Sequence, residues 1–271
     1  MSQNIVLLSF GMTLIAGLAT GIGSSIALLA KRTNKKFLCF SLGLSAGVML
    51  YVSFMDLIPN AKDALSLYYG ERTGMLTLML AFFGGMGLIT IIDFLIPQPN
   101  NPHELQGVEE LNRQNGKQNS LYRTGIVVAL SLTAHNFPEG IAAFTTAMTS
   151  GLSVAIPITI AIAIHNIPEG IAVSVPIYHA TGSRKKAFWL SFLSGLTEPL
   201  GALVAYLFLM PFWSPQINGI VMAAVAGIMV YISVDELLPT AERHGEHHFS
   251  IAGLILGMIL ISTCLFFFIE T

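Results

Sequence analysis

"AGVMLYVSFMDLIPNA", residues 46–61, returns in similar form as "AGIMVYISVDELLPTA", residues 226–241. Half of the aligned positions are identical, and each copy carries a carboxylate, Asp56 or Glu236, at the same place within an apolar run. Each run extends beyond the quoted letters and is long enough to cross a lipid bilayer as a helix. The chain therefore contains an internal duplication of at least one membrane-spanning segment.

The composition of the whole chain indicates a membrane protein. Of its 271 residues, 54% are hydrophobic and only 10% are charged, and the mean hydropathy is +0.70. A soluble protein keeps about a quarter of its residues charged, so this chain cannot cover itself with a polar surface. The net charge of −2, without any basic block, argues against nucleic acid as a partner. Cys39 and Cys264 lie far apart in apolar runs, which excludes a disulfide framework and a thiolate metal motif.

Eight apolar stretches are long enough to cross a bilayer as helices, which takes about 20 residues. They lie at about 5–30, 37–58, 75–96, 124–147, 154–178, 187–209, 217–238 and 249–268. The sequence therefore predicts an all-α integral membrane protein with eight transmembrane helices, folded as a single transmembrane domain over residues 1–271. The connection 97–123 is polar and rich in proline, and we expect it to be a loop between helices 3 and 4.

Lysine and arginine are concentrated in alternate connections between these spans. One side of the membrane receives only Lys62 and Arg72. The other receives Lys31, Arg32, Lys35, Lys36, Arg113, Lys117, Arg123, Arg184, Lys185, Lys186 and Arg243. Cytoplasmic connections carry the excess of these residues. We therefore expect a multi-pass protein of the cytoplasmic (inner) membrane, with the loop 97–123 in the cytoplasm and both termini outside it.

The distance between the two quoted copies predicts their relative orientation. They are 180 residues apart, a shift of five predicted spans, so they run in opposite directions through the membrane. When the alignment of the two copies is shifted by two residues, "GLATGIG" from Gly17 also matches "GLTEPLG" from Gly195. Helices 1–3 therefore form an inverted repeat with helices 6–8. This architecture is typical of secondary transporters with a binding site at the membrane midplane.

A second repeat lies between these two halves: "LTAHNFPEGIA", residues 132–142, and "IAIHNIPEGIA", residues 162–172. The copies occupy the middle of the fourth and fifth spans, which are predicted to be antiparallel. In each copy, histidine lies four residues and asparagine three residues before glutamate, so the three side chains share one helix face. The glycine that follows each glutamate, Gly140 or Gly170, allows close approach of a neighbouring helix.

The polar residues of this repeat predict a metal site. Together with Glu198, at the centre of the sixth span, the residues at one membrane depth are His135, Asn136, Glu139, His165, Asn166 and Glu169. Imidazole nitrogens and carboxylate or amide oxygens suit Zn²⁺ and are compatible with Fe²⁺, Mn²⁺ or Co²⁺. A single intramembrane histidine more often bridges two helices through a hydrogen bond. Two matched copies at the depth of Glu198 favour metal binding instead.

Carboxylates lie inside the predicted spans, whereas lysine and arginine do not. The carboxylates are Asp56, Asp93, Glu139, Glu169, Glu198, Asp235 and Glu236. Without basic partners they must be protonated, face water or hold a cation, and such residues indicate function by default. By topology, Asp56 is near the outer end of its span, whereas Asp93, Asp235 and Glu236 are near the inner end. We regard these four as candidates for a cation route.

The two HNxPEG segments, followed by Glu198 in "GLTEPLG", resemble those of the ZIP (Zrt-, Irt-like protein) metal transporters, bacterial members above all. The resemblance covers all eight predicted spans. It implies uptake of divalent transition metals across the cytoplasmic membrane, zinc first, with iron, manganese and cobalt as further substrates. It also implies a carrier rather than an enzyme. Family members often form homodimers and are associated with an elevator-like movement of helices 1, 4, 5 and 6.

The resemblance further implies a binuclear site between helices 4, 5 and 6, in which the two glutamates of the repeat bridge the metals. The first metal would be bound by His135, Glu139, His165, Glu169 and Glu198. The second would be bound by Asn136, Glu139, Asn166 and Glu169.

Two other functions are compatible with buried metal ligands. An intramembrane zinc metallohydrolase would also use histidine and glutamate, because a zinc-bound water is a nucleophile. An HExxH motif is absent from the sequence, and inverted repeats have no role in a hydrolase. A cation-coupled carrier of an organic solute would need an anion- or ring-binding subsite, for which the core offers no Arg, Lys or Trp.

Overall fold

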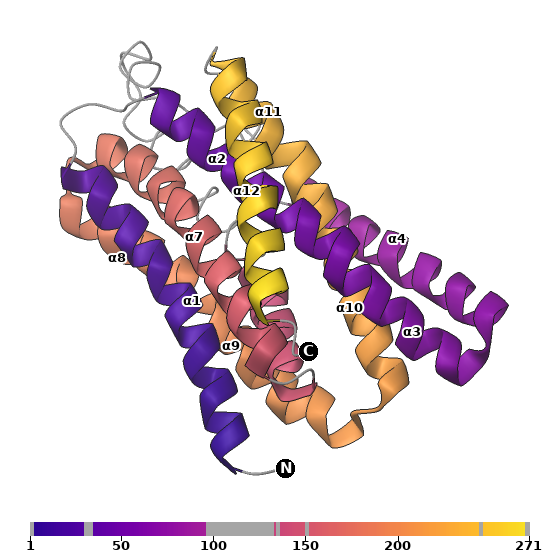
Figure 1. The fold of residues 1–271 in the computed structure, drawn as a ribbon. Coiled ribbons are helices and arrows are strands. Elements are labelled where there is room, and N and C mark those ends of the chain that lie inside the picture. Colours follow the sequence, from indigo (N-terminus) through magenta and orange to yellow (C-terminus); the bar gives the residue numbers. More distant parts are fainter. Residues whose placement is uncertain are drawn as a thin grey trace.

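The computed structural model describes residues 3–29, 35–95, 133, 136–149, 152–243 and 246–268. All secondary structure within these ranges is helical, and the long helices lie roughly side by side in one elongated bundle (Figure 1). This confirms the predicted all-α class. The predicted loop 97–123 lies outside the described residues.

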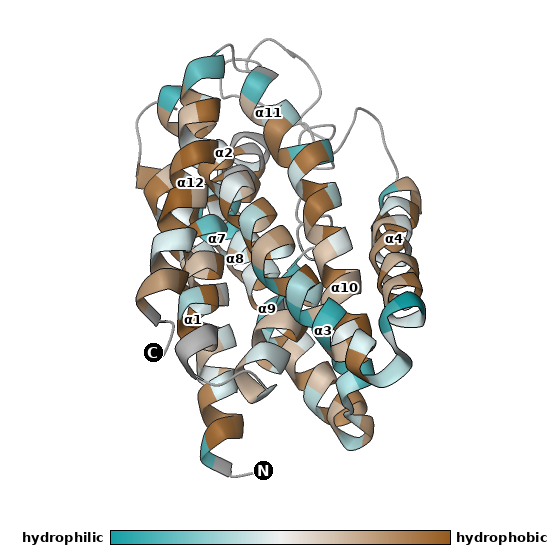
Figure 2. Cartoon of the chain, turned by 45° about the vertical axis from the view of Figure 1, so that its right-hand side comes forward, coloured by the Kyte–Doolittle hydropathy of each residue, from teal (hydrophilic) through white to brown (hydrophobic). Residues whose placement is uncertain are grey.

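Within these ranges, seven helical spans are long and apolar enough to cross a membrane. They are Asn4–Leu29, Lys36–Tyr69, Glu71–Leu95, Ala155–Val175, Arg184–Phe212, Pro215–Glu242 and His247–Phe267. The remaining predicted span, 124–147, is described only at 133 and from 136 onward, where the chain is helical to 149. Hydrophobic residues follow the lengths of the helices and hydrophilic residues gather at many of their ends (Figure 2), as expected for helices that face lipid.

Several spans are built from more than one helical element. The first half of the chain contains α1 (Gln3–Leu29), α2 (Lys35–Val52), the π-helical η1 (Ser53–Leu57), α3 (Ile58–Tyr69) and α4 (Glu71–Leu95). After the helical segment 136–149 come α7 (Leu152–Thr181), α8 (Arg184–Gly195), α9 (Thr197–Val204), η2 (Ala205–Leu209) and η3 (Met210–Phe212). The last spans contain α10 (Pro215–Ile232), the π-helical η4 (Ser233–Leu237), α11 (Leu238–Arg243) and α12 (His247–Phe268).

The second predicted span is longer than the expected range 37–58, because the helix continues through Pro59 to Tyr69. In η1 the hydrogen bonds widen by one residue, and the Ile58 N–H donates to the carbonyl oxygen of Ser53. Pro59 therefore enters in the first turn of α3, where a missing N–H is tolerated. The chain reverses only at Gly70, whose φ of 78° suits glycine.

The 180-residue sequence repeat has a conformational counterpart. Both copies contain a π-helical turn at equivalent positions, η1 and η4. In each, a serine hydroxyl donates to a methionine carbonyl over 2.8 Å: Ser53 to Met49, and Ser233 to Met229. Segments of this kind are rare and often occur at functional sites. Their presence at both positions supports the interpretation of the two segments as copies.

Helix packing around these copies is also reciprocal. A Cβ on Gly47 of α2 would overlap the carbonyl oxygen of Leu254 on α12. A Cβ on the equivalent Gly227 of α10 would overlap the carbonyl oxygen of Phe82 on α4. Each half thus packs its second helix against the last helix of the other half. Equivalent contacts of this kind are expected when the two halves are copies related by a two-fold axis.

The ends of the bundle differ in charge. Both chain termini lie at one end of the bundle, whereas α2 and α8 begin at the other (Figure 1). The basic end carries Lys36 together with Arg184, Lys185 and Lys186, all of them exposed. The basic starts of α2 and α8 therefore lie at the end of the bundle opposite the ends labelled N and C (Figure 1).

Candidate metal site

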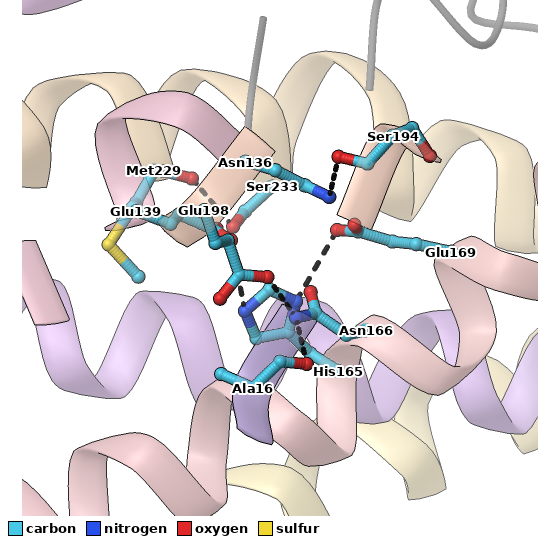
Figure 3. A network of polar contacts seen from close by, with 10 residues as sticks. All are labelled: Ala16, Asn136, Glu139, His165, Asn166, Glu169, Ser194, Glu198, Met229 and Ser233. Atoms are coloured by element: carbon cyan, nitrogen blue, oxygen red, sulfur yellow. Dashed lines mark hydrogen bonds and ion pairs between the residues drawn. The ribbon is translucent and has the colours of Figure 1, made fainter. Parts of the chain in front are cut away.

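A cluster of polar side chains lies buried where segment 136–149, α7 and α9 meet (Figure 3). Each of its six residues is at most 2% exposed: Asn136, Glu139, His165, Asn166, Glu169 and Glu198. These are six of the seven residues predicted from the sequence to bind metal. The seventh, His135, lies outside the described residues.

His165 occupies a position between two glutamates. Its Nδ1 lies 3.3 Å from Oε1 of Glu169, one turn further along α7, as the four-residue spacing predicts. Its Nε2 lies 3.4 Å from Oε2 of Glu139 on the neighbouring segment. The imidazole thus connects the two copies of the HNxPEG repeat, and each of its nitrogens faces a different carboxylate.

The two asparagines are held by their amide nitrogens. Nδ2 of Asn166 donates to the carbonyl oxygen of Ala16 on α1 over 2.9 Å, and also to Oε1 of Glu198. Nδ2 of Asn136 donates to the carbonyl oxygen of Ser194 on α8 over 3.3 Å. Because the nitrogens are anchored to neighbouring helices, the amide oxygens point away from those backbones. Within the described part of the chain, neither oxygen has a hydrogen-bond partner.

Many ligand-type atoms of the cluster have no hydrogen-bond partner among the residues that the structure describes. They are Oδ1 of Asn136 and Asn166, both carboxylate oxygens of Glu139, both ring nitrogens of His165, and Oε2 of Glu169 and Glu198. A buried polar atom without a partner costs about 1–3 kcal/mol, so such a concentration requires an explanation. Oxygen and imidazole nitrogen donors on facing helices are the set that a divalent transition metal binds.

The donors do not form a ready-made cage. Among the described residues, no three His, Cys, Asp or Glu side chains are arranged around a common point as metal ligands. The reason is visible in the geometry, because His165 separates Glu139 from Glu169. The imidazole of His165 occupies the space between the two carboxylates.

Two glycines allow the cluster to form. A Cβ on Gly140, beside Glu139, would overlap the carbonyl oxygen of Glu198. A Cβ on Gly170, beside Glu169, would overlap the carbonyl oxygen of Thr20 on α1. The predicted close approach at both glycines is confirmed. It brings α9 and α1 into direct backbone contact with the repeat.

A small cavity lies beside Glu139 and His165, with a volume of about 10 Å³. One wall comes from α2, η1 and α10, through Val48, Val52, Leu57 and Met229. The other wall comes from segment 136–149 and α7, through Ala142, Thr146, Ile158, Ala161 and Ile162. The side chains that α2, η1 and α10 contribute to the cavity beside the cluster are therefore all apolar.

The four candidate route residues lie on other elements, η1, α4 and η4. Asp56 is 9% exposed, and Nδ2 of Asn60 donates to its Oδ1 over 3.1 Å. Glu236 is 5% exposed, Asp93 is half-buried and Asp235 is exposed. The structure does not bring these carboxylates into the cluster. Leu57, the neighbour of Asp56, lines the cavity beside it.

The backbone anchors of the asparagines were not predicted from the sequence. Ala16 and Ser194 contribute carbonyl oxygens, and a carbonyl group is present at every residue. The available signal was indirect: Gly17 and Gly195, one residue after each anchor, pack so closely that a Cβ on either would overlap the other's carbonyl oxygen. Both glycines belong to the matched heptapeptides of the sequence.

Comparisons with known proteins identify relatives of this chain. The family model described as ZIP Zinc transporter matches residues 97–265. A protein named "Zinc transporter ZupT" from Clostridium perfringens is 52% identical, over 99% of this chain and 98% of its own length. Proteins of the same name are 53% identical in Streptococcus mutans, over 99% and 100%, and 56% identical in Oceanobacillus iheyensis, over 96% and 97%. The similarity thus extends over almost the whole chain.

Proposed function

Because the chain belongs to the ZIP zinc transporter family, we propose that it takes up divalent metal ions, zinc first, across the cytoplasmic membrane. The observation that carries this proposal is the cluster of Glu139, Glu169 and Glu198, buried in a membrane protein. Within the described ranges, His165 is the only ionisable side chain that pairs with these glutamates. A divalent cation supplies the positive charge that the cluster lacks.

We further propose that the cluster binds two metal ions side by side. The first is bound by His135, Glu139, His165, Glu169 and Glu198, and the second by Asn136, Glu139, Asn166 and Glu169. Support for the second comes from the asparagines, whose amide nitrogens are anchored while their oxygens have no hydrogen-bond partner in the described ranges. Iron, manganese and cobalt are further substrates in this proposal, because the oxygen donors accept all of them.

Release of the metal requires the site to move relative to its surroundings. All cluster residues lie on segment 136–149, α7 and α9, and their amide anchors lie on α1 and α8. The apolar wall of the cavity belongs to α2, η1 and α10. We propose that α1, segment 136–149, α7, α8 and α9 move as one body and carry the metal past α2, η1 and α10.

The route to and from the site is proposed from charge and topology. With both termini outside the cytoplasm and the 97–123 loop inside, Asp56 attracts metal at the outer face. Glu236, Asp235 and Asp93 receive it at the inner face. That the protein forms a homodimer is predicted only from its resemblance to the family.

The direct test is uptake of radioactive zinc by vesicles that contain the purified protein. Zinc should accumulate in proportion to the amount of protein, and unlabelled zinc should compete. The matched control is Glu242→Ala, which removes a carboxylate that is half-exposed at the end of α11. Vesicles that take up no zinc above protein-free vesicles would exclude the proposed function.

A further inference from the structure

Thr146 is a buried hydroxyl that the metal cluster does not use. It lies seven residues after Glu139 on segment 136–149, so the two side chains share a helix face about 10 Å apart along the axis. Both line the cavity beside His165. Thr146 is 1% exposed, and its Oγ1 has no hydrogen-bond partner among the described residues.

Neighbouring threonines behave differently. Oγ1 of Thr145 donates to the carbonyl oxygens of Ile141 and Ala142, over 2.8 and 3.1 Å. Thr149 and Thr159 donate to the carbonyls four residues earlier, over 2.7 and 2.8 Å. This back-bonding is the usual way for a helix to satisfy a hydroxyl where water is absent. Thr146 does not make it, so its hydroxyl is available to the cavity.

The surroundings of Thr146 offer no substitute within the described residues. Apart from Glu139 and His165, the cavity is lined by aliphatic side chains and Met229. An unpartnered hydroxyl in such a place is destabilising. The cavity volume of about 10 Å³ is close to the minimum for one water molecule. The cavity is thus large enough for one water molecule. Because most of its lining is apolar, the Thr146 hydroxyl is one of the few groups to which that water can form a hydrogen bond.

We propose that Thr146 is a positioning residue for metal passage, whose hydroxyl binds a water molecule carried by the ion between Glu139 and the far end of segment 136–149. This inference rests on the proposed transport function, under which that end faces the outside. A divalent ion must exchange its waters for protein ligands on entering the cluster. Along this path Thr146 provides the polar contact that supports a partly hydrated ion before Glu139 binds it.

The experiment compares Thr146→Val, Thr146→Ser and Thr145→Val in the vesicle assay, together with equilibrium zinc binding to each purified protein. Thr146→Val keeps the shape and removes the hydroxyl, and we expect its maximal uptake rate to fall by up to about tenfold, the upper end of the effect of one neutral hydrogen bond. Zinc affinity at equilibrium should stay within about twofold of the original protein, because no ligand is lost. Thr146→Ser should restore the rate.

Thr145→Val is the matched control, since Thr145 is equally buried and bonds only within its own helix. A normal rate for Thr146→Val, or an equal loss for Thr145→Val, would overturn the inference. So would a loss of zinc affinity as large as the loss of rate. If the valine variant does not fold, Thr146→Ala removes the same hydroxyl with less volume and has the same expected results. Failure of the unsubstituted protein to take up zinc would instead disprove the proposed function.

Discussion

The two repeats of this protein place their acidic residues in different ways. The HNxPEG copies lie on adjacent segments that are predicted to be antiparallel, and their glutamates converge on a single imidazole, His165, at 3.3 and 3.4 Å. The 180-residue copies place Asp56 and Glu236 on separate π-helical turns, η1 and η4, each outside the cluster. Copies that are neighbours in space contribute their glutamates to one shared cluster, whereas copies in opposite halves of the chain leave their carboxylates at two separate positions.

This contrast predicts different consequences of removing charge. The glutamates of the shared site should be essential for every metal, because each is proposed to bind both ions. The separate carboxylates should affect only the rates of entry and release. Four experiments test this comparison, in order of decreasing effect.

Glu169→Ala should lower zinc and manganese uptake by at least about a hundredfold, since a ligand shared by two metals acts in binding and in transport. The measurement is initial uptake at matched protein amount, with Glu242→Ala as the surface control. Near-normal zinc uptake by Glu169→Ala would remove this residue from the site and with it the proposed bridging role.

Gly140→Ala should lower the free energy of unfolding by about 1–3 kcal/mol, because its Cβ would overlap the backbone at Glu198. It should also reduce uptake by displacing α9 from the cluster. Thermal unfolding in detergent provides the measurement. Gly11→Ala on α1, where a Cβ would meet no atom within 4 Å, is the control and should not be destabilised. Equal stability of both variants would contradict the close packing at Gly140.

His165→Gln should weaken zinc uptake more than manganese uptake, because imidazole is a softer ligand than an amide. We expect the ratio of zinc to manganese uptake to fall by about tenfold, equivalent to about 1.4 kcal/mol of differential binding. Competition between the two metals in one assay measures this ratio directly. An equal loss for both metals would mean that His165 only holds Glu139 and Glu169 in place.

Asp56→Asn should have the smallest effect: a rise of about two- to threefold in the external zinc concentration for half-maximal uptake at low salt. At 0.15 M salt the effect should shrink, because the attraction of an ion that is still in solution is screened beyond about 8 Å. Glu236→Gln should slow the maximal rate and leave the half-maximal concentration unchanged. Uptake curves at two salt concentrations distinguish the two variants. If both match the unsubstituted protein, these carboxylates lie outside the route.

The sequence by itself determined the class of the protein and predicted which polar residues lie together at its centre. Apolar runs of about 20 residues identify membrane helices because the bilayer imposes that length on any helix that crosses it. Spacing along a helix is equally local, so the pairing of His165 with Glu169 on one face followed from their four-residue separation. The matched glycines, Gly140 and Gly170, likewise predicted where backbones would meet.

Only the tertiary structure decided how these residues are arranged. It placed His165 between two glutamates, anchored the asparagines to the carbonyl oxygens of Ala16 and Ser194, and left the hydroxyl of Thr146 facing a cavity. It also carried the second span through Pro59 by way of a π-helical turn. These features depend on which backbones cross and at what distance. A carbonyl group is common to all residues, so its partners are set by helix packing, and only the neighbouring glycines, Gly17 and Gly195, mark them indirectly in the sequence.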